Sequence, residues 1–402
     1  MILSVTSTAS GSQYGERPVL LVCFSHLRWD FVYQRPQHLL SRAAAGQDVY
    51  FLEEPVHEAG LQMPRLNLRR DPSGVMVAVP VLPEGYDAAR AVAAQHDFLN
   101  EILEEHEGAA TTFWYYTPMA LRFSGHCEPD VCVYDCMDEL SAFHGAPPEL
   151  TALENQLFAR ADLVFTGGQS LYEAKQSRHH SVHAFPSSID KAHFARARQP
   201  GLAGPEDQRG IPRPRIGFFG VVDERMDTAL VDALAAARPD WHFVMIGPVV
   251  KIDPASLPRR PNLHWLGMKS YQELPQYLAG WDAGFMPFAM NASTRFISPT
   301  KTPEFLAAGL PVVCTPVRDV QRPYGMLGLV EIAGTAEEMA QALDKVMAGP
   351  RPEWQAAVER HLADMSWDAT WAAMEALIRQ SHKAAAPASG ADGPRQGVGA
   401  DV

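Results

Sequence analysis

The sequence predicts an α/β protein in which two doubly wound sheets face each other across a cleft. Short apolar runs that suit buried parallel strands recur along the chain, and amphipathic helical stretches separate them. The beginning of the chain already alternates strand, loop, helix and strand, which is one β-α-β unit of a parallel sheet. The alternation restarts at residue 215, so we expect a second sheet of the same kind. Ligands of such sheets bind outside the carboxyl ends of the strands, which places the expected site in the cleft.

The individual elements follow from the apolar runs and from the helical patterns between them. In the first half we expect helices at 36–45, 88–107, 151–161 and 170–176, and strands at 19–24, 48–52, 75–79, 112–116, 131–134, 163–166 and 182–185. In the second half we expect helices at 227–238, 275–279 and 336–347, a short helix that ends at residue 309, and strands at 215–220, 242–246, 263–266, 283–287, 310–314 and 330–332.

Changes in composition divide the chain into domains. Residues 195–214 are rich in Arg, Pro, Gly and Gln and have little periodicity, which is typical of a linker. We therefore expect a first domain over residues 1–200 and a second over 201–365. The residues 366–383 predict a tail helix, and the Ala-, Gly-, Pro- and Ser-rich residues 384–402 are expected to be disordered.

Charge, cysteine content and hydrophobicity restrict the class of protein. The 402-residue chain has a formal net charge of −13, which argues against a broad nucleic-acid surface. Its five cysteines include no C-x-x-C pair, so we expect no zinc site and reduced, cytosolic thiols. The N-terminus does not resemble a signal peptide, and no apolar run is long enough to span a membrane. A cytoplasmic protein without nucleic-acid partners is therefore expected, and a peripheral membrane contact stays open.

The most informative stretch runs from Ser298 to Val313 and predicts a polar loop, a short helix and a buried strand. Thr300 or Thr302 can cap the helix, and Gly309 ends it. The apolar run that follows suits a central strand of a parallel sheet, so the helix start should lie at the edge of that sheet.

Two charged side chains at this helix start are candidates for ligand binding. Backbone N–H groups at the beginning of a helix lack partners inside it, and together with the positive charge of Lys301 they suit a phosphate group. The Glu304 carboxylate could accept hydrogen bonds from a sugar diol. The alternative is structural, because the helix dipole alone favours a Glu in the first turn and the Lys could be only solvated.

The loop after the first strand of the second half supplies another candidate pair. Gly220 would let a phosphate approach the backbone, and Arg225 could fork onto a diphosphate. The alternative for Arg225 is an ion pair with Asp223 or Asp227 at the surface.

Gly247 and Met268 follow the next two strands, and the backbone groups of these loops could hold the edge of a nucleobase. Glycines after strands are commonly only turns, which is the alternative interpretation. The chain contains neither a G-x-G-x-x-G nor a Walker A sequence, which disfavours dinucleotide binding and phosphate-loop chemistry.

In the first half, the loop after the first strand is crowded with aromatic and polar side chains. Rings stack on sugars and polar groups reach hydroxyls, so this loop could bind a sugar through His26, Trp29, Tyr33, Arg35, Gln37 and His38. Alternatively, Trp29 and Tyr33 are core or interface anchors and His38 is a solvated helix residue.

Carboxylates follow a later strand of the first half. Asp135 and Asp138 are candidate acids, bases or ligand-binding groups, with His144 in the next loop, although Asp138 could equally cap a helix or stabilise a turn. The chain has no D-x-D sequence of the kind that holds a metal ion with a diphosphate. We therefore expect metal-independent chemistry in which Arg and Lys replace the ion.

Together these residues resemble a known family. The chain resembles a GT-B glycosyltransferase of the glycosyl transferases group 1 type, in the bacterial branch used for exopolysaccharide assembly, from about Val19 to His382. The most specific part is Ser298–Val313, and Asp30–His38 looks like the first-loop signature of that branch. The resemblance implies two Rossmann-like domains, with the acceptor on the first and a nucleotide sugar on the second. The tail helix from Trp367 looks like the segment that returns to the first domain.

The resemblance also implies roles for single residues. In the family the Glu of the motif binds the ribose of the sugar nucleotide, and the loop and helix start bind its diphosphate; these roles fall to Glu304, Lys301 and Thr300. Phe296 stands where the family has a further Glu, and Arg225 alone represents its usual Arg and Lys pair. The resemblance implies retention at the reacting carbon, and because of these departures inversion stays open as the alternative.

The expected activity is transfer of a sugar from a UDP- or GDP-linked donor to a hydroxyl of a glycan or small-molecule acceptor, without a cofactor. Arg225 and Lys301 would stabilise the departing diphosphate, and Asp138 would act as a base. The residues expected on the acceptor side are His26, Trp29, Arg35, His38 and His144. Two alternatives stay open: a nucleotide-sugar epimerase of the same fold, and a catalytically degenerate scaffold partner.

Overall fold

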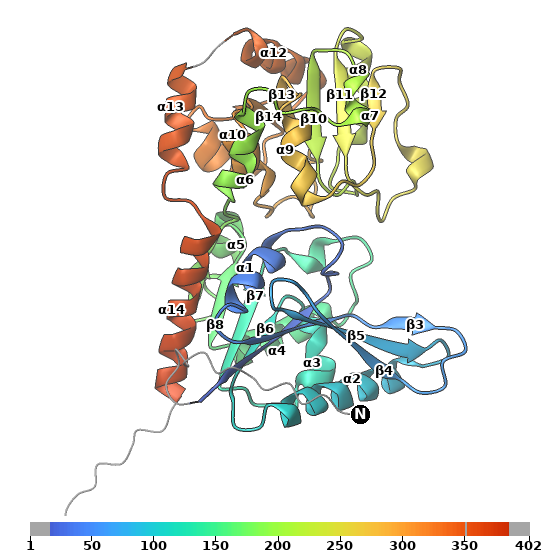
Figure 1. Ribbon diagram of the computed structural model, residues 1–402, viewed down its shortest axis with the longest axis vertical. Helices are drawn as coiled ribbons and strands as arrows, with labels where there is room; N and C mark the ends of the chain where they lie inside the picture. The colour runs from blue at the N-terminus through green and yellow to red at the C-terminus, as the bar shows by residue number, and fades with distance from the viewer. Residues whose placement is uncertain (1–16, 350–351, 386–402) are drawn as a thin grey trace, which may run out of the picture.

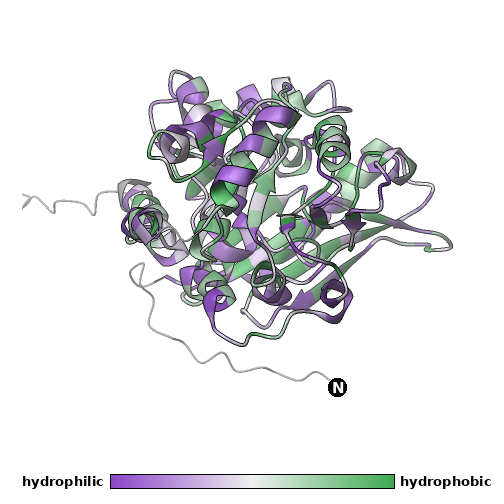
Figure 2. Ribbon diagram, turned by 90° about the horizontal axis from the view of Figure 1, so that it is seen from above, coloured by the Kyte–Doolittle hydropathy of each residue, from purple (hydrophilic) through white to green (hydrophobic). Residues whose placement is uncertain are grey.

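The computed structural model describes residues 17–349 and 352–385, which form two lobes stacked along the long axis of the molecule (Figure 1). In each lobe a largely parallel sheet separates two apolar clusters, one on each face of the sheet. Figure 2 shows apolar residues concentrated on the strands and polar residues towards the outside. The prediction of an α/β protein with two doubly wound sheets is therefore confirmed.

The N-terminal lobe contains a nine-stranded sheet in the order β3-β5-β2-β1-β6-β7-β8-β9, with β4 antiparallel to β5. Its strands are β1 (Val19–Ser25), β2 (Asp48–Glu53), β3 (Val56–Glu58), β4 (Arg65–Arg70), β5 (Met76–Pro83), β6 (Ala110–Tyr115), β7 (Val131–Cys136), β8 (Leu163–Thr166) and β9 (Val182–Ala184). Its helices are α1 (Arg35–Ala43), α2 (Ala88–Glu105), α3 (Leu121–Ser124), α4 (Leu150–Arg160) and α5 (Gln169–Lys175), with 3₁₀ turns η1 (Pro118–Ala120) and η2 (Leu140–Ala142).

The C-terminal lobe contains a six-stranded, all-parallel sheet in the order β12-β11-β10-β13-β14-β15. Its strands are β10 (Arg215–Phe219), β11 (His242–Ile246), β12 (Leu263–Trp265), β13 (Ala283–Met286), β14 (Val312–Cys314) and β15 (Glu331–Ile332). Its helices are α6 (Lys191–Ala195), α7 (Glu206–Arg209), α8 (Thr228–Ala237), α9 (Leu274–Leu278), α10 (Lys301–Ala307), α11 (Arg318–Val320), α12 (Ala336–Met347) and α13 (Pro352–His361). Its shorter turns are η3 (Arg196–Arg198), η4 (Pro254–Ser256), η5 (Tyr271–Glu273) and η6 (Gln321–Gly325).

The strand order fixes where a ligand can bind in each lobe. In the C-terminal sheet the order reverses between β10 and β13, and in the N-terminal sheet it reverses between β1 and β6. Loops on either side of such a reversal diverge and leave a crevice outside the carboxyl ends of the strands.

Several short elements and the helix α13 were not expected from the sequence, and two further differences have a clear cause. Strands β3 and β4 were not expected, because their residues are exposed and charged and lack the apolar run of a buried strand. Residues 195–214 are not a loose linker, since Ala197 and Ile211 belong to the apolar core of the C-terminal lobe. The buried side chain of Gln208 also accepts a hydrogen bond from Trp281 Nε1 at 2.7 Å. Isolated apolar residues of this kind produce no period that sequence inspection can detect.

The final helix, α14 (Trp367–Ala385), packs against the N-terminal lobe, as Figure 1 shows. Trp367, Trp371 and Met374 are buried in its core, and the rings of Trp371 and Trp114 lie 6.3 Å apart. The chain thus passes twice between the lobes, and Lys191 Nζ ties the two passages by donating to the carbonyls of Leu362 and Ala363, each at 2.9 Å. Most of the expected disordered tail, 386–402, lies outside the described residues. None of the helices in the described part of the chain has the length and apolar character needed to cross a membrane.

Candidate functional site

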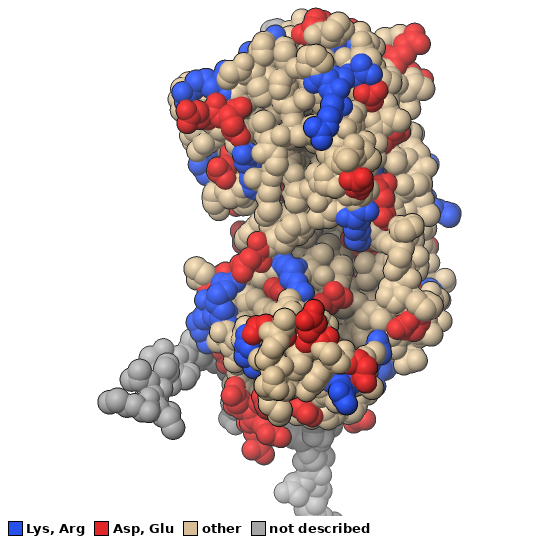
Figure 3. Space-filling model, turned by 90° about the vertical axis from the view of Figure 1, so that its right-hand side faces the viewer, with Lys and Arg blue, Asp and Glu red and all other residues tan. Residues whose placement is uncertain are grey.

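A cavity of about 150 Å³, here called the central cavity, lies between the lobes at the carboxyl ends of both sheets. Figure 3 shows the hollow between the lobes from outside, with charged side chains along its rim. The C-terminal lobe lines the cavity with Gly220, Arg225, Ser298, Thr300, Lys301 and Glu304, and the N-terminal lobe lines it with Tyr33, Arg35, Asp138, Gly167 and Ser187. The structure therefore brings together the charged residues predicted at the start of α10, at the end of β10 and after β7.

The start of α10 faces this cavity with uncapped backbone. Thr300 has helical dihedral angles at the N-cap position, and its side chain makes no capping hydrogen bond. Thr302 is buried, and its hydroxyl points to Met286 Sδ at 3.8 Å. The prediction that one of these threonines caps the helix is wrong, because both are already turned into the helix. Thr302 N–H donates to the Pro299 carbonyl at 3.2 Å and Glu304 N–H to the Thr300 carbonyl at 3.4 Å, and Pro303 has no N–H, so of this turn only the N–H of Lys301 can serve a ligand.

Lys301 lies across the end of β10. The backbone of Gly220 has φ of +131°, and a Cβ built there would overlap Lys301 Cε, so only glycine fits. Burial lowers the pKa of Lys301, and so does the nearby charge of Arg225, whereas Glu304 acts in the opposite direction. Within the described residues no carboxylate lies in salt-bridge range of this ammonium group. Lys301 Nζ lies 5.7 Å from the ring centroid of Phe218 but has no carboxylate partner among the described residues, and an anionic ligand could supply the missing negative charge.

Glu304 is the acidic counterpart of this arrangement. It is only 7% exposed, and burial raises the pKa of its carboxyl, while Lys301 acts to lower it. Both groups are therefore shifted towards their neutral forms. A ligand that brings negative charge to Lys301 and hydroxyl groups to Glu304 would favour the charged form of each.

Arg225 adopts the alternative arrangement considered for it. Its guanidinium forks onto Asp223, with Nη2 to Oδ2 at 2.7 Å and Nε to Oδ1 at 3.0 Å. The guanidinium carbon also lies 5.5 Å from the ring centroid of Phe143, which belongs to the N-terminal lobe. Arg225 is consequently both paired and exposed to the central cavity, where its charge can act on a diphosphate.

Gly247 and Met268 lie in a neighbouring space of about 380 Å³, here called the side cavity, outside the ends of β10, β11 and β12. Gly247 has φ of +145°, and a Cβ on it would overlap the carbonyl oxygen of Gly220, so the two loops can approach this closely only with glycine. Met268 is 44% exposed at the rim. The central and side cavities share Tyr33, Gly220 and Tyr271 in their walls, which makes them two parts of one cleft.

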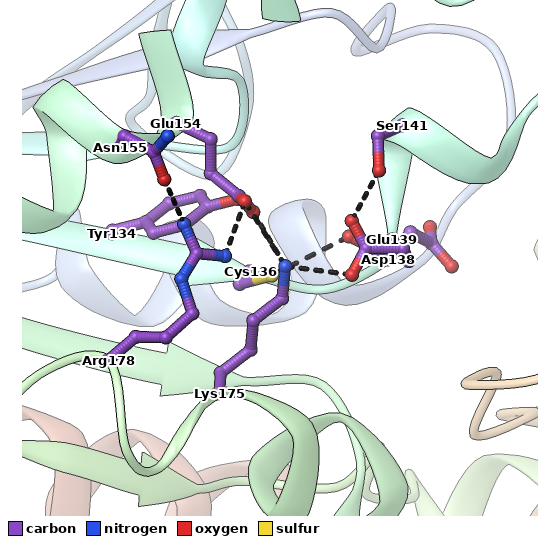
Figure 4. A network of polar contacts seen from close by, with 9 residues as sticks. All are labelled: Tyr134, Cys136, Asp138, Glu139, Ser141, Glu154, Asn155, Lys175 and Arg178. Carbon is purple, nitrogen blue, oxygen red and sulfur yellow. Dashed lines mark hydrogen bonds and ion pairs between the residues drawn. The ribbon is translucent and has the colours of Figure 1, made fainter. Parts of the chain in front are cut away.

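Asp138 is presented to the central cavity by an anchored loop. The adjacent Glu139 pairs with the buried Lys175 at 2.7 Å, and Lys175 also pairs with Glu154 at 2.9 Å. Figure 4 shows this network, with Asp138 pointing away from Lys175. Burial raises the pKa of Asp138, and Arg225 acts to lower it. The carboxylate therefore has a fixed position and a raised basicity, as a proton acceptor requires.

Several acceptor-side candidates serve the packing of the N-terminal lobe instead. Arg35 and Asp135 are 2% and 0% exposed and form a forked ion pair at 2.9 Å, and Arg35 also donates to the carbonyl of Phe185 at 2.7 Å. Trp29 borders the side cavity, but its ring packs on Phe51 at 5.0 Å. These residues are anchors because their polar groups already have protein partners.

The three histidines proposed for the acceptor side do not line the central or the side cavity. His38 is buried against α14, where its ring stacks on Trp367 at 4.6 Å, and burial and Arg42 lower its pKa to about 3. Burial and the charge of Lys251 lower the pKa of His26 to about 4. His144 is exposed, and its backbone N–H donates to Glu224 Oε1 at 3.0 Å, so it links the lobes. Their placement corrects the sequence prediction.

The structure adds residues that the sequence did not indicate. Lys251 has φ of +61°, the one positive value at a non-glycine residue in the described ranges, and its ammonium lies 4.7 Å from the ring centroid of Phe143 across the cleft. Tyr271 lines both cavities. Neither belongs to a recognisable motif, since their roles depend on contacts with the opposite lobe.

Comparison with known proteins bears on the family and on the fold. Residues 213–349 match the family described as "Glycosyl transferases group 1". A Bacillus subtilis (strain 168) protein named as a teichuronic acid biosynthesis glycosyltransferase, TuaH, is 27% identical over 237 residues, which span 54% of this chain and 59% of that relative.

Three solved structures resemble the whole fold. Sucrose-phosphate synthase from Thermosynechococcus elongatus has a TM-score of 0.65 at 14% identity, covering 92% of this chain and 100% of that one. An E. coli structure titled trehalose-6-phosphate, with bound UDP-2-fluoro glucose, has a TM-score of 0.64 at 13% identity, covering 90% and 99%. Anabaena Alr3699/HepE with UDP and glucose has a TM-score of 0.60 at 14% identity, covering 89% and 98%. At these identities the likeness concerns the fold.

Proposed function

We propose that this chain, whose residues 213–349 match the glycosyl transferases group 1 family, is a GT-B glycosyltransferase that transfers a sugar from a nucleoside diphosphate donor to a hydroxyl acceptor. The observation that carries the proposal is the position of Lys301 and the buried Glu304 at a helix start that opens to a cavity between two lobes. The relative from Bacillus subtilis supports a place in polysaccharide or glycoconjugate biosynthesis.

The donor fits along the edge of the C-terminal sheet. Its base would occupy the side cavity beside Gly247 and Met268, and its diphosphate would cross Gly220 towards Thr300 and Lys301. Glu304 would accept hydrogen bonds from the ribose. A UDP- or GDP-linked sugar is the proposed donor. The UDP bound in the Anabaena structure and the UDP-2-fluoro glucose bound in the E. coli structure support a UDP-linked donor.

In the proposed reaction the bond between the anomeric carbon and the diphosphate breaks, and the acceptor oxygen forms a new bond to that carbon. Lys301 and Arg225 stabilise the charge that grows on the departing diphosphate, without a metal ion or other cofactor. Asp138 binds the acceptor hydroxyl from the opposite lobe. With retention, the departing phosphate takes the hydroxyl proton; with inversion, Asp138 takes it. We favour retention because of the family resemblance, and the anomeric coupling of the product measured by NMR tests this.

The acceptor is proposed to be a glycan or small molecule that enters from the N-terminal lobe. A nucleotide-sugar epimerase of the same fold would also have two lobes around its site, so the requirement for an acceptor distinguishes it from a transferase. A scaffold without activity needs no desolvated cation beside Gly220. We further propose that the protein acts in the cytoplasm, where nucleotide sugars are available.

The test is a thermal-shift screen of the purified chain against UDP-, GDP-, ADP-, CMP- and dTDP-sugars, followed by a transfer assay with EDTA present. Binding of one nucleotide class stabilises the folded state by mass action, so we expect a rise in Tm with that class alone. A rise that Lys301→Met abolishes supports the site. No shift with any nucleotide sugar would overturn the proposal, and isomerised sugar without an acceptor would point to the epimerase.

A further inference from the structure

We propose that Tyr271 is a specificity-determining residue of the donor site, whose phenolic hydroxyl works with Glu304 to bind a ribose hydroxyl of the nucleotide. This inference rests on the proposed function and extends it to a residue outside the Ser298–Val313 motif. It concerns discrimination between ribose and deoxyribose, to which Tyr271 would add a hydrogen-bond donor beside the acceptor Glu304.

The position of Tyr271 is the first observation. In a nucleoside diphosphate the ribose lies between the base and the diphosphate. Tyr271 lies in the wall that the side cavity and the central cavity share, and Glu304 lines the central cavity. A donor with its base in one cavity and its diphosphate in the other must place its ribose beside Tyr271.

The unmet hydrogen-bonding capacity of this residue is the second observation. The hydroxyl of Tyr271 is buried and has no hydrogen-bond partner among the described residues. Burial raises the pKa of this phenol, and the charge of Glu304 raises it further, so the hydroxyl remains a donor. A buried hydroxyl without a partner is unfavourable, so a ligand group that pairs with it gains affinity. A sugar hydroxyl between the two groups would accept from Tyr271 and donate to Glu304, which satisfies both.

The rigid placement of the ring is the third observation. One face of Tyr271 stacks on His193 at 4.3 Å with an interplanar angle of 8°, and its carbonyl lies 2.9 Å from His193 Nε2. Its ring also stacks on Tyr33 of the N-terminal lobe, at 4.7 Å. Stacking from both lobes fixes the direction of the hydroxyl, as selective recognition requires.

The test compares ribose and deoxyribose nucleotides by isothermal titration of the full chain. UDP, GDP and their 2′-deoxy and 3′-deoxy forms are titrated into the wild type and into Tyr271→Phe. The substitution keeps the ring and removes only the hydroxyl. We expect the wild type to bind the ribose nucleotide more tightly than its deoxy forms. In the variant, the ratio of the deoxy Kd to the ribose Kd should fall by about 3- to 10-fold for either the 2′- or the 3′-deoxy nucleotide.

The matched control is Tyr277→Phe. This hydroxyl is bonded to Asp207 at 2.9 Å and does not line either cavity, so its removal should leave the preference unchanged. A general loss of folded protein lowers the apparent affinity for the ribose and deoxyribose nucleotides by the same factor. The ratio of the two affinities therefore stays informative in a less stable variant. If the ratio of ribose to deoxyribose affinity is the same in Tyr271→Phe as in the wild type, the inference about Tyr271 is wrong, although the proposed donor site is not affected. Failure of the wild type to bind either UDP or GDP overturns the donor site itself.

Discussion

Two loops of this protein carry the same kinds of polar and aromatic side chains and use them in opposite ways. The stretch from the loop before α10 into its first turn leaves Lys301 and Glu304 without contact ion partners among the described residues, at the edge of a cavity. The stretch from the loop after β1 into α1 commits its polar groups to the protein: the backbone N–H of Trp29 donates to Glu53 at 2.8 Å, and the Gln37 side chain donates to the carbonyl of Trp29 at 2.7 Å.

The difference shows that residue type alone does not mark a binding loop. A polar group is available to a ligand only if the rest of the chain leaves it unpaired. In the stretch after β1 the partners include Glu53 and Asp135, which are distant in sequence, whereas at the start of α10 the described residues provide no ion-pair partner for Lys301. Variants of the two loops should therefore separate stability from activity.

The largest expected effect is on stability. Arg35→Met removes one member of the fully buried pair with Asp135 and leaves a buried charge without compensation. We expect the free energy of unfolding to fall by about 3–5 kcal/mol, measured by urea denaturation. Asp135→Asn should cost a similar amount, and the double variant less than the sum. If Arg35→Met instead has normal stability and only a raised KM for the acceptor, Arg35 belongs to the acceptor site.

Lys301→Met should have the opposite profile. Its ammonium is desolvated without a contact ion pair, so the free energy of unfolding should stay the same or rise. Turnover should fall by about 10²- to 10³-fold, because a cation that stabilises the leaving group is lost. Steady-state kinetics with the donor identified by the thermal screen measure this. Lys345→Met, which removes an exposed ion pair with Glu331, is the matched control and should change neither the turnover nor the free energy of unfolding measurably.

Glu304→Gln should affect donor affinity more than turnover. Hydrogen bonds to a charged group contribute about 1.5–3 kcal/mol, so we expect the KM for the donor to rise by about 10-fold or more. The amide keeps the size of the side chain and one acceptor oxygen. An unchanged KM with a large loss of turnover would move Glu304 from the ribose to the reacting sugar.

The affinity for a diphosphate should depend on pH through Lys301. Its pKa lies below the ordinary value of 10.5, because of burial first and Arg225 second. Between the lowered and ordinary values the unfolded chain binds more protons, so this group makes stability rise with pH. UDP is fully ionised above about pH 7, so its affinity should fall as pH rises through the lowered pKa. Lys301→Arg should abolish the fall, and an identical profile in both proteins would exclude Lys301.

The smallest expected effect is at His38. The neutral ring packs flat against Trp367, so His38→Phe keeps the stack. We expect a change in unfolding free energy within about 1.5 kcal/mol and unaltered donor and acceptor KM. A raised acceptor KM in a normally folded variant would show that this histidine reaches the substrate.

Much of the fold follows from the sequence because local signals coincide with the structure. Strand β8 and helix α12 have the expected bounds, since an apolar run or a helical period defines each of them. Gly220 and Gly247 were also identified locally, because a glycine directly after a buried strand indicates a close approach of backbone.

Other features could not be read from the sequence. Ala197 and Ile211 are single apolar residues in a polar stretch, and only the completed core shows that they are buried. The pairing of Arg35 with Asp135, 100 positions apart, is invisible without the sheet that joins them. Tyr271 becomes a candidate only when the two lobes meet around it.

The most direct test of the donor site is a crystal structure of the chain with UDP. We expect a phosphate oxygen within about 2.7–2.9 Å of Lys301 Nζ and the ribose hydroxyls beside Glu304, with the base in the side cavity. A UDP molecule bound elsewhere, with Lys301 and Glu304 untouched, would contradict the account.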